Sequence, residues 1–392
     1  MKKHKTNIAF FMDGGEGGGV SEYNRLLSSN IDRDQFYTIG IFIGKGKCYD
    51  SLNMLFDKSV ILSWGRLVNY KPDSNKYLTL IEKSIIAFYS FIYLIILILR
   101  YNIKIIDVSY YPHHIIAGFA AQITGIKCIW HWHGASTFRN LKYKILSMSG
   151  ELFASKIVAI SNFVKLSLPE NLIAKTDIIY NGVEIEDHED FNLFTHLGIS
   201  EKYTLIAMIG TLIPLKGHTH FINTAHEMLM INPNMKFLII GEETEIHQKK
   251  FKYKETLNDL ILYLNRENDI LFTGNIPNIS MYLKSLSCVI MPTRPYKDVM
   301  GEGFGLVAVE AMAKGVPVIA TNTGAFEEII SHGKDGFLVR PDDIENTVKY
   351  IEFILKKENS AYISQNAKNK VKQKFTIQRM VNQLESLYQM YC

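Results

Sequence analysis

The amino-acid sequence predicts an α/β protein with two domains, each built around a parallel β-sheet. Short apolar runs that are typical of buried strands alternate with helical patterns along the chain, which is the order that parallel sheets produce. The chain has 392 residues, which is long for a single hydrophobic core, so two domains of under about 200 residues each are expected. An acidic, polar stretch, Glu184–Phe191, lies between two such alternating runs and is the expected linker.

Composition argues against several classes of function. The formal net charge of +4 is small for this length and gives no sign of nucleic-acid binding. The basic N-terminus runs into an apolar stretch, Ile8–Met12, that is too short for the core of a secretion signal. The four cysteines are far apart and show no metal-ligand spacing, which is typical of reduced thiols in the cytosol: Cys48, Cys128, Cys288 and Cys392. We therefore expect a cytoplasmic protein.

One apolar run raises the question of a membrane. Ile85–Leu99 carries no charged side chain and is followed by Arg100. At 15 residues the run is shorter than the roughly 20 that a spanning helix needs. The sequence favours a helix packed under a sheet, and a helix partly inserted into a membrane face stays the alternative. Peripheral attachment to the inner face of the cell membrane is the most that this run supports.

The first strand leads into a glycine-rich turn. Ile8–Met12 is typical of a buried parallel strand, and Asp13–Gly19 precedes a helix that is expected to begin at Val20. Such a turn suits phosphate binding or the close approach of a sugar, although a simple tight turn is the alternative. It does not match the dinucleotide-binding fingerprint, because Val20 stands where the third glycine belongs.

Histidines gather at the ends of two further strands. Ile126–Trp132 is predicted to be a strand, and alternation along it puts the rings of His131 and His133 on one face at its C-terminal end. A histidine followed by glycine at such an end often belongs to a site, whereas a lone histidine is usually structural. His113 and His114 follow the strand Lys104–Ser109 and are acceptor-binding candidates by position alone, as is His131.

Two loops of the second half carry charged candidates. Thr204–Ile209 reads as a strand that ends in Gly210, and the following loop contains Lys216. Cys288–Met291 is the strand before Gly301–Glu310, a glycine-rich approach to an apolar helix that is expected to begin at Leu306 and end at Gly315.

The two acids of that glycine-rich stretch are unusual. Glu302 lies just ahead of the helix, where backbone N–H groups face an anion. Glu310 lies within the apolar helix, where burying a carboxylate is costly unless hydrogen bonds satisfy it. The alternative is that Glu302 caps the helix and Glu310 lies on a solvated edge.

Two acids separated by seven residues, with Gly-Phe-Gly between them, resemble the Glu-x7-Glu motif of the retaining glycosyltransferase family 4 (GT4). Lys314–Ala320 and Thr323–Ile329 continue the resemblance, which is strongest over Gly210–Pro341. It implies the GT-B fold, in which two Rossmann-like domains have parallel sheets facing an interdomain cleft. The implied parts are an acceptor-binding domain at 1–185, a nucleotide-sugar-binding domain at 186–372, and a helix at 373–392 that crosses back to the first domain.

The resemblance also implies a reaction. A sugar would pass from a nucleotide-diphosphate sugar, with UDP as the expected nucleotide, to a hydroxyl of a glycan or lipid-linked oligosaccharide, with retention of configuration. Bacterial surface polysaccharide synthesis is the implied setting. His133, Glu302 and Lys216 would form the catalytic group. The donor would be held by Gly18, Gly19, Gly210, Thr211, Lys216, Ile276, Arg294, Gly303, Phe304, Gly305, Leu306 and Glu310.

One position departs from the family pattern. Thr211 stands where the family usually has an arginine, and a hydroxyl cannot offset phosphate charge. Arg294 is the candidate for the missing cation. This departure leaves open a non-catalytic sugar-nucleotide-binding homologue, while another GT-B enzyme, such as a sugar-nucleotide epimerase, is the second alternative.

No metal or other cofactor is expected. The spacing Asp32-x-Asp34 resembles a metal motif of another glycosyltransferase fold, but it falls in a helix-to-strand loop, where aspartate is common turn chemistry.

Overall fold

A computed structural model describes residues 5–12, 18–46, 48–62, 76–110, 113–135, 141–185, 190–243 and 252–392. The chain divides into two compact units. The first holds the chain up to His133, the stretch that ends at Gly182, and Ile377–Cys392. The second holds Val183–Thr376 and a short segment that begins at Gly134. These boundaries lie within a few residues of the expected ones at 185 and 373, apart from that short segment.

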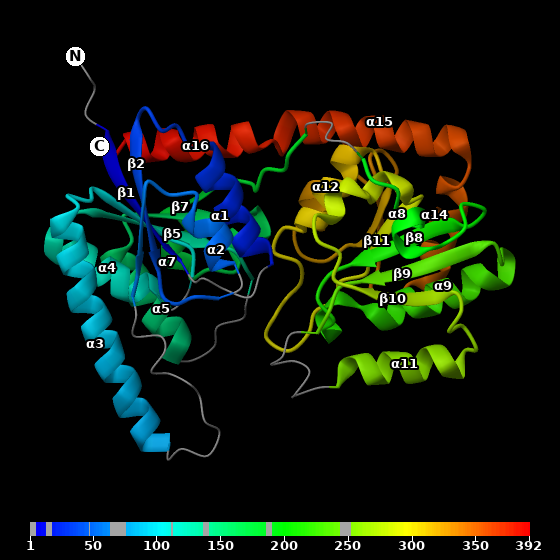
Figure 1. The fold of residues 1–392 in the computed structure, drawn as a ribbon, viewed down its shortest axis with the longest axis horizontal. Coiled ribbons are helices and arrows are strands. Elements are labelled where there is room, and N and C mark those ends of the chain that lie inside the picture. The colour runs from blue at the N-terminus through cyan, green and yellow to red at the C-terminus, as the bar shows by residue number, and fades with distance from the viewer. Residues whose placement is uncertain are drawn as a thin grey trace. The chain divides into compact units, whose positions relative to one another are not determined.

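The first unit is built on a seven-stranded sheet with the order β3-β2-β1-β4-β5-β6-β7. All of its strand pairs are parallel, which confirms the predicted α/β class. The strands are β1 (Thr6–Met12), β2 (Phe36–Phe42), β3 (Lys58–Ile61), β4 (Ile105–Val108), β5 (Lys127–Trp132), β6 (Lys156–Ala159) and β7 (Thr176–Ile178). Figure 1 shows them in the blue to green part of the chain.

Helices cover both faces of this sheet. They are α1 (Gly19–Asn30), α2 (Tyr49–Asn53), α3 (Lys76–Arg100), α4 (His113–Thr124), α5 (Leu141–Phe153), α6 (Asn162–Leu166), α7 (Glu170–Ile173) and α16 (Ile377–Gln389). Alternation along β5 separates the two faces. Ile129 belongs to the core that α1, α2 and α16 share, whereas Trp130 contacts the positions of Gly118 on α4 and Gly150 on α5.

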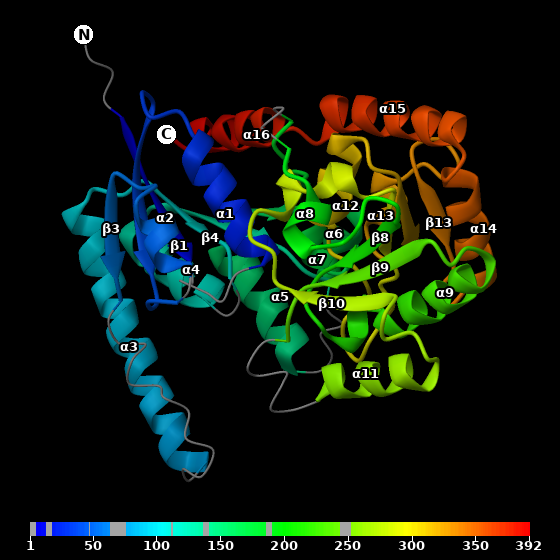
Figure 2. The same cartoon turned by 45° about the vertical axis from the view of Figure 1, so that its right-hand side comes forward.

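Helix α3 contains the apolar run, packs against α4 and buries one face only. Leu94, Leu97 and Ile98 are buried, while other apolar side chains of the helix are exposed. Figures 1 and 2 show its first turns extending beyond the rest of the unit. No described helix is both long enough and apolar enough to cross a membrane.

The second unit is built on a six-stranded parallel sheet with the order β10-β9-β8-β11-β12-β13. Its strands are β8 (Thr204–Ile209), β9 (Met235–Ile240), β10 (Ile270–Gly274), β11 (Cys288–Met291), β12 (Val318–Thr321) and β13 (Phe337–Val339). Its helices are α8 (Leu193–Leu197), α9 (His218–Ile231), α11 (Tyr253–Tyr263), α12 (Leu306–Lys314), α13 (Phe326–Ile329), α14 (Ile344–Ile354) and α15 (Lys357–Lys374).

The last helix begins later than expected. α16 starts at Ile377 rather than at 373, because the chain leaves helical geometry at Phe375 (φ −125°) and Thr376 pairs with Val183. Two 3₁₀ turns, Ile279–Met281 and Leu283–Ser285, precede β11.

Candidate functional site

In the second unit, the loop after β8 presents Lys216. The strand ends at Gly210, and the chain then makes a 3₁₀ turn, Pro214–Lys216, before α9 begins. Gly217 joins the turn to the helix at φ 75°, and a Cβ there would lie 1.8 Å from the carbonyl oxygen of Pro292. Only glycine fits this close approach, so the direction of the loop depends on Gly217.

Lys216 is paired with Glu302, although the two are far apart in the sequence. Its Nζ lies 2.6 Å from Oε2 of Glu302, and their side chains are 20% and 16% exposed. The structure therefore brings two of the three predicted catalytic residues into direct contact. A partly shielded ion pair at a loop edge leaves the ammonium free to take a second anionic partner, because it has three donors.

Helix α12 begins next to this pair. Its N-cap is Gly305, at φ 87°, and no side chain caps the helix. The first N–H groups of such a helix lack intrahelical partners and favour an anion. The carboxylate of Glu302 accepts a hydrogen bond from Nζ of Lys216 at 2.6 Å. Glu310 follows one turn after Leu306 and is half-buried.

The glycine-rich loop ahead of α12 is held by packing. A Cβ at Gly305 would lie 2.6 Å from the ring of Phe326. Phe304 is buried, and its ring meets that of Phe375 at 5.7 Å between centroids. The backbone N–H of Ala325 donates to the carbonyl oxygen of Glu302 at 2.9 Å. These contacts fix the loop, so Gly303 and its neighbours have a defined backbone for ligand contact.

The cation expected from Arg294 is engaged elsewhere. Its guanidinium lies 3.3 Å from a carboxylate oxygen of Asp342, and the two side chains are 40% and 59% exposed. Exposed pairs of this kind contribute at most about 1 kcal/mol. Its backbone N–H donates to Leu215, the residue before Lys216, at 2.9 Å. The structure thus places Arg294 beside the loop of Lys216 while its charge is directed at Asp342.

Ile276, one of the predicted donor-binding residues, is buried just beyond β10. Gly274 at the strand's end has φ 74° and accepts the backbone N–H of Gly241 at 2.9 Å.

In the first unit, His133 lies immediately after β5. Its ring centroid is 4.8 Å from that of Tyr23, and burial lowers the pKa of its imidazole well below the usual value. Its Nε2 is buried and has no hydrogen-bond partner in the described part of the chain. A neutral ring with an unsatisfied nitrogen is consistent with a ligand-binding histidine.

His131 and His114 do not remain accessible for an acceptor. His131 is 1% exposed; its Nδ1 accepts from the hydroxyl of Tyr23 at 2.9 Å, and its Nε2 lies 2.8 Å from Asp107. His114 is also buried, and its Nε2 donates to the carbonyl oxygen of Val108 at 2.9 Å. We interpret both as structural, because alternation turned His131 toward the helices of its own unit rather than toward solvent.

The other first-unit candidates lie at helix starts. His113 is half-buried at the beginning of α4, with its ring 5.5 Å from that of Phe11. Gly18 and Gly19 are exposed at the beginning of α1, with Gly18 at φ 106°. The rest of the glycine-rich turn, residues 13–17, lies outside the described residues.

The residues around His131 were missed by sequence reasoning. Tyr388 on α16 donates to the same oxygen of Asp107 at 2.7 Å, so Tyr23, His131, Asp107 and Tyr388 form one buried chain of hydrogen bonds. A carboxylate within the apolar strand β4 was a usable signal. No comparable signal in the sequence pointed to the two tyrosines, because they lie on α1 and α16, at opposite ends of the chain.

Asp32 and Asp34 form turn chemistry in the structure. The backbone N–H of Asp34 donates to Oδ1 of Asp32 at 2.8 Å. No group of three or more His, Cys, Asp or Glu side chains suited to a metal is present among the described residues.

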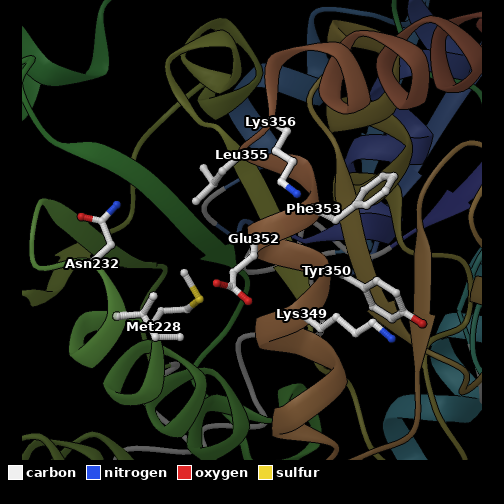
Figure 3. Close-up of a pocket in the computed structure, with 9 residues that line it drawn as sticks. Met228, Asn232, Lys349, Tyr350, Glu352, Phe353, Leu355 and Lys356 are labelled. Atoms are coloured by element: carbon white, nitrogen blue, oxygen red, sulfur yellow. The ribbon is translucent and has the colours of Figure 1, made fainter.

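Three surface hollows described in the second unit are lined by none of these candidates. One, of about 460 Å³, opens between α9 and α14. Figure 3 shows Met228 and Asn232 on one side of it and the α14 side chains from Lys349 to Phe353 on the other. The residues lining it include none of the predicted donor-binding residues.

The fold and the site together define a class of protein: two parallel α/β units, one of which presents a lysine–glutamate pair beside an uncapped helix. The family model Glycosyl transferases group 1 matches residues 190–390, and Glycosyltransferase Family 4 matches residues 64–187. The chain belongs to the group 1 glycosyltransferases and is a GT4-type enzyme with the GT-B fold. It is thus a transferase of the glycosyltransferase class, as the sequence predicted.

Relatives and solved structures agree with this assignment. The chain is 25% identical over 293 residues to the UDP-Gal:alpha-D-GlcNAc-diphosphoundecaprenol alpha-1,3-galactosyltransferase of Escherichia coli, covering 70% of this chain and 72% of that one. It is 26% identical over 301 residues to the N-acetyl-alpha-D-glucosaminyl L-malate synthase of Bacillus anthracis, covering 74% and 75%. The fold matches that of Anabaena Alr3699/HepE in complex with UDP at a TM-score of 0.81, with 20% identity, covering 98% of this chain and 100% of that one.

Proposed function

We propose that this enzyme transfers a sugar from a UDP-sugar to a hydroxyl of a glycan or lipid-linked oligosaccharide in bacterial surface polysaccharide synthesis, with retention of the anomeric configuration. The observation that carries the proposal is the contact of Lys216 and Glu302, at 2.6 Å, beside the uncapped start of α12. Several relatives are named for nucleotide-sugar or polysaccharide reactions, and Alr3699/HepE has been solved with UDP and with UDP-glucose.

The proposed roles follow from charge. The departing diphosphate gains negative charge in the transition state, and Lys216 together with the first N–H groups of α12 would stabilise it there. Glu302 holds the lysine in place and would bind hydroxyls of the donor sugar. Glu310, one turn into the helix, would accept the ribose hydroxyls. If so, Glu310→Gln weakens donor binding by about 1.5–3 kcal/mol, and unchanged affinity in calorimetry would refute that role.

The stereochemical part of the proposal rests on the carboxylates. Glu302 and Glu310 are assigned to sugar and ribose, so neither of them is available as the nucleophile of a double displacement. Departure of the diphosphate and attack by the acceptor on the same face would then retain configuration. His133, neutral and unsatisfied at Nε2, is the proposed contact for the donor sugar, and His113 the remaining candidate for the acceptor.

A cationic lysine and a helix N-terminus can neutralise a diphosphate without a metal, so the proposal requires no cofactor. NMR of the product formed from an α-linked donor, in buffer with and without EDTA, tests both points. An α-linked product whose yield survives EDTA is expected. A β-linked product, or activity that EDTA abolishes and Mn²⁺ restores, would contradict the mechanism.

The donor itself can be identified by screening. UDP-, GDP- and dTDP-sugars are compared for thermal stabilisation, because a ligand at 100 times its Kd adds about 2.7 kcal/mol to the stability of the folded state. The largest shift is expected with a UDP-sugar. A larger shift with GDP- or dTDP-sugars would overturn that choice.

A second candidate remains because Thr211 replaces the family's arginine: a homologue that binds the sugar nucleotide without turning it over. Release of UDP from the stabilising donor, by transfer or by slow hydrolysis, separates the two. Binding without any release would favour the non-catalytic candidate.

A lipid-linked acceptor is anchored in a membrane. The proposal therefore includes peripheral attachment of the enzyme to the inner face of the cell membrane.

A further inference from the structure

The outer face of α3 is apolar and exposed. Its exposed side chains recur at helical spacing, so they form one stripe along the helix, while Leu94, Leu97 and Ile98 are buried. A helix that is apolar on both sides is normally covered on both sides. The stripe contains Ile85, Phe88, Tyr89, Ile92, Ile96 and Leu99, which are 40–67% exposed.

Helices α4 and α5 continue this surface. The ring of Phe91 on α3 stacks on that of Phe119 on α4 at 5.0 Å, and Phe119 meets Phe153 on α5 at 5.6 Å. The three helices are therefore neighbours on one side of the sheet. Their further exposed apolar side chains include Phe119, Ile123, Leu141, Ile145, Met148 and Leu152, and Met148 is 64% exposed. We call the exposed apolar side chains of α3, α4 and α5 the apolar helical face.

Exposed basic side chains lie at the end of α3 and at the start of α5. Arg100 ends α3, and Lys142 and Lys144 lie exposed in the first turn of α5. α4 carries no lysine, arginine, aspartate or glutamate. The carboxylate of α5, Glu151, accepts a hydrogen bond from Asn171 at 2.9 Å. Tyrosines and basic residues around an apolar surface are the composition of an interface between water and lipid.

We propose that the apolar helical face docks on a lipid bilayer with anionic headgroups, with α3 lying along the interface. This proposal rests on the proposed function only in that a lipid-linked acceptor gives the enzyme a reason to be there. The 15 residues of Ile85–Leu99 measure about 22 Å as a helix, which is shorter than the roughly 30 Å of a bilayer core. This apolar run is thus long enough to lie within one leaflet and shorter than the bilayer core.

A second copy of the chain is a poorer occupant. Across a two-fold interface the same patch meets itself, so one interface would have to hold Arg100, Lys142 and Lys144 of both copies. Anionic headgroups instead complement these charges, at about 1 kcal/mol per basic residue near the surface, or roughly fivefold in affinity.

Vesicle flotation of the full-length protein tests the proposal. The vesicles contain either phosphatidylglycerol with phosphatidylethanolamine or phosphatidylcholine alone. We expect strong binding to the anionic vesicles, weaker binding to the others, and partial release in high salt. Phe88→Gln with Leu99→Gln on α3, and separately Met148→Gln with Leu152→Gln on α5, should each weaken binding by roughly tenfold or more, because apolar side chains no longer enter lipid.

The matched control lies in the second unit. Met230 and Leu262 are 69% and 56% exposed, and Met230→Gln with Leu262→Gln should leave vesicle binding unchanged. Equal binding by all three double variants, or no binding by the unmodified protein, overturns the proposal. So does a dimer in lipid-free light scattering that only the α3 and α5 variants dissociate.

Sugar transfer to a water-soluble acceptor is measured in parallel. Vesicle binding without transfer would reject the proposed function and keep the docking surface, whereas transfer without vesicle binding would do the reverse. The α3 and α5 variants should retain this soluble activity, which also shows that they are folded.

Discussion

At the scale of single residues, the contact of Lys216 with Glu302 predicts how turnover and binding separate. Charge on the leaving group is largest in the transition state, so Lys216→Ala should lower kcat more than donor affinity, by roughly 10²–10³-fold. Steady-state kinetics and calorimetry with the donor measure the two effects. Lys252→Ala is the control, because Lys252 also pairs with a glutamate, Glu255, at 3.3 Å but is 74% exposed.

Two results would contradict this assignment in different ways. A fully active Lys216→Ala enzyme would remove the lysine from the reaction. Equal losses in kcat/KM and donor affinity, with kcat unchanged, would indicate that Lys216 binds the diphosphate uniformly in the ground state and the transition state.

Buried histidines make stability depend on pH. Burial lowers the pKa of His114 to about 3, below its usual value of 6.5. Between these values the unfolded chain binds the proton and the folded one does not, so the contribution of this group is full above pH 6.5 and is lost as pH falls toward 3. The free energy of unfolding should therefore fall by about 1.4 kcal/mol per pH unit for this histidine over that window.

Urea denaturation between pH 7 and 4 checks this, by comparing the unmodified protein with His114→Gln. The variant should show a shallower dependence on pH, whereas His196→Gln, at an exposed position, should keep the original slope. Identical slopes for all three proteins would mean that His114 becomes protonated without unfolding.

At the scale of secondary-structure elements, two glycines with nearly the same φ allow the cost of a left-handed backbone to be distinguished from the cost of a steric clash. Gly217 and Gly125 have φ 75° and 73°, but a Cβ at Gly217 would meet Pro292 at 1.8 Å, and one at Gly125 would meet nothing within 4 Å. Gly125→Ala should cost about 1 kcal/mol, as a left-handed alanine does. Gly217→Ala should cost several kcal/mol, or displace the loop of Lys216 and lose donor binding.

Thermal denaturation and donor calorimetry of both variants decide the matter. Similar stability of the two alanine variants, with donor affinity retained in each, would show that the turn before α9 can shift without disturbing Lys216.

The elements also show what a sequence can and cannot disclose. The beginning of α12 at Leu306 and its end at Gly315, which has φ 74°, followed from glycine and apolar spacing alone. The contact of Lys216 with Glu302 could not be predicted from the local sequence pattern, because the two residues are far apart in the sequence. Only the family resemblance indicated that their motifs belong to one site. The partner of Arg294, Asp342, and the break at Phe375 depend on tertiary contacts that no local pattern encodes.

At the scale of the whole molecule, α16 belongs to the first unit. Ile377, Met380, Leu384 and Tyr388 lie in the core that α1 and the first sheet build. Tyr388→Phe removes a donor from the buried Asp107, so the first unit should lose about 1–3 kcal/mol. Tyr362→Phe on α15, where the side chain is 57% exposed, is the control.

Tryptophan fluorescence measures the stability of the first unit selectively. The chain has three tryptophans, Trp64, Trp130 and Trp132, and all lie within the stretch of the first unit that ends at His133. The urea midpoint seen by fluorescence should fall in Tyr388→Phe, while stabilisation of the second unit by the donor should persist. A midpoint that does not change would show that Asp107 does not need this hydroxyl.

The return of α16 has a consequence for how the protein is made. On the ribosome, the strands of the first unit emerge early, but the helix that completes their core is translated only after Val183–Thr376, whose 194 residues take roughly 10–40 s. During that interval the nascent first unit exposes the apolar surface and the Asp107 carboxylate that α16 will cover. The second unit is formed by an almost continuous stretch of chain, so it can be complete before the first unit is. Chaperones would therefore be needed chiefly by the first unit, although its strands are synthesised first.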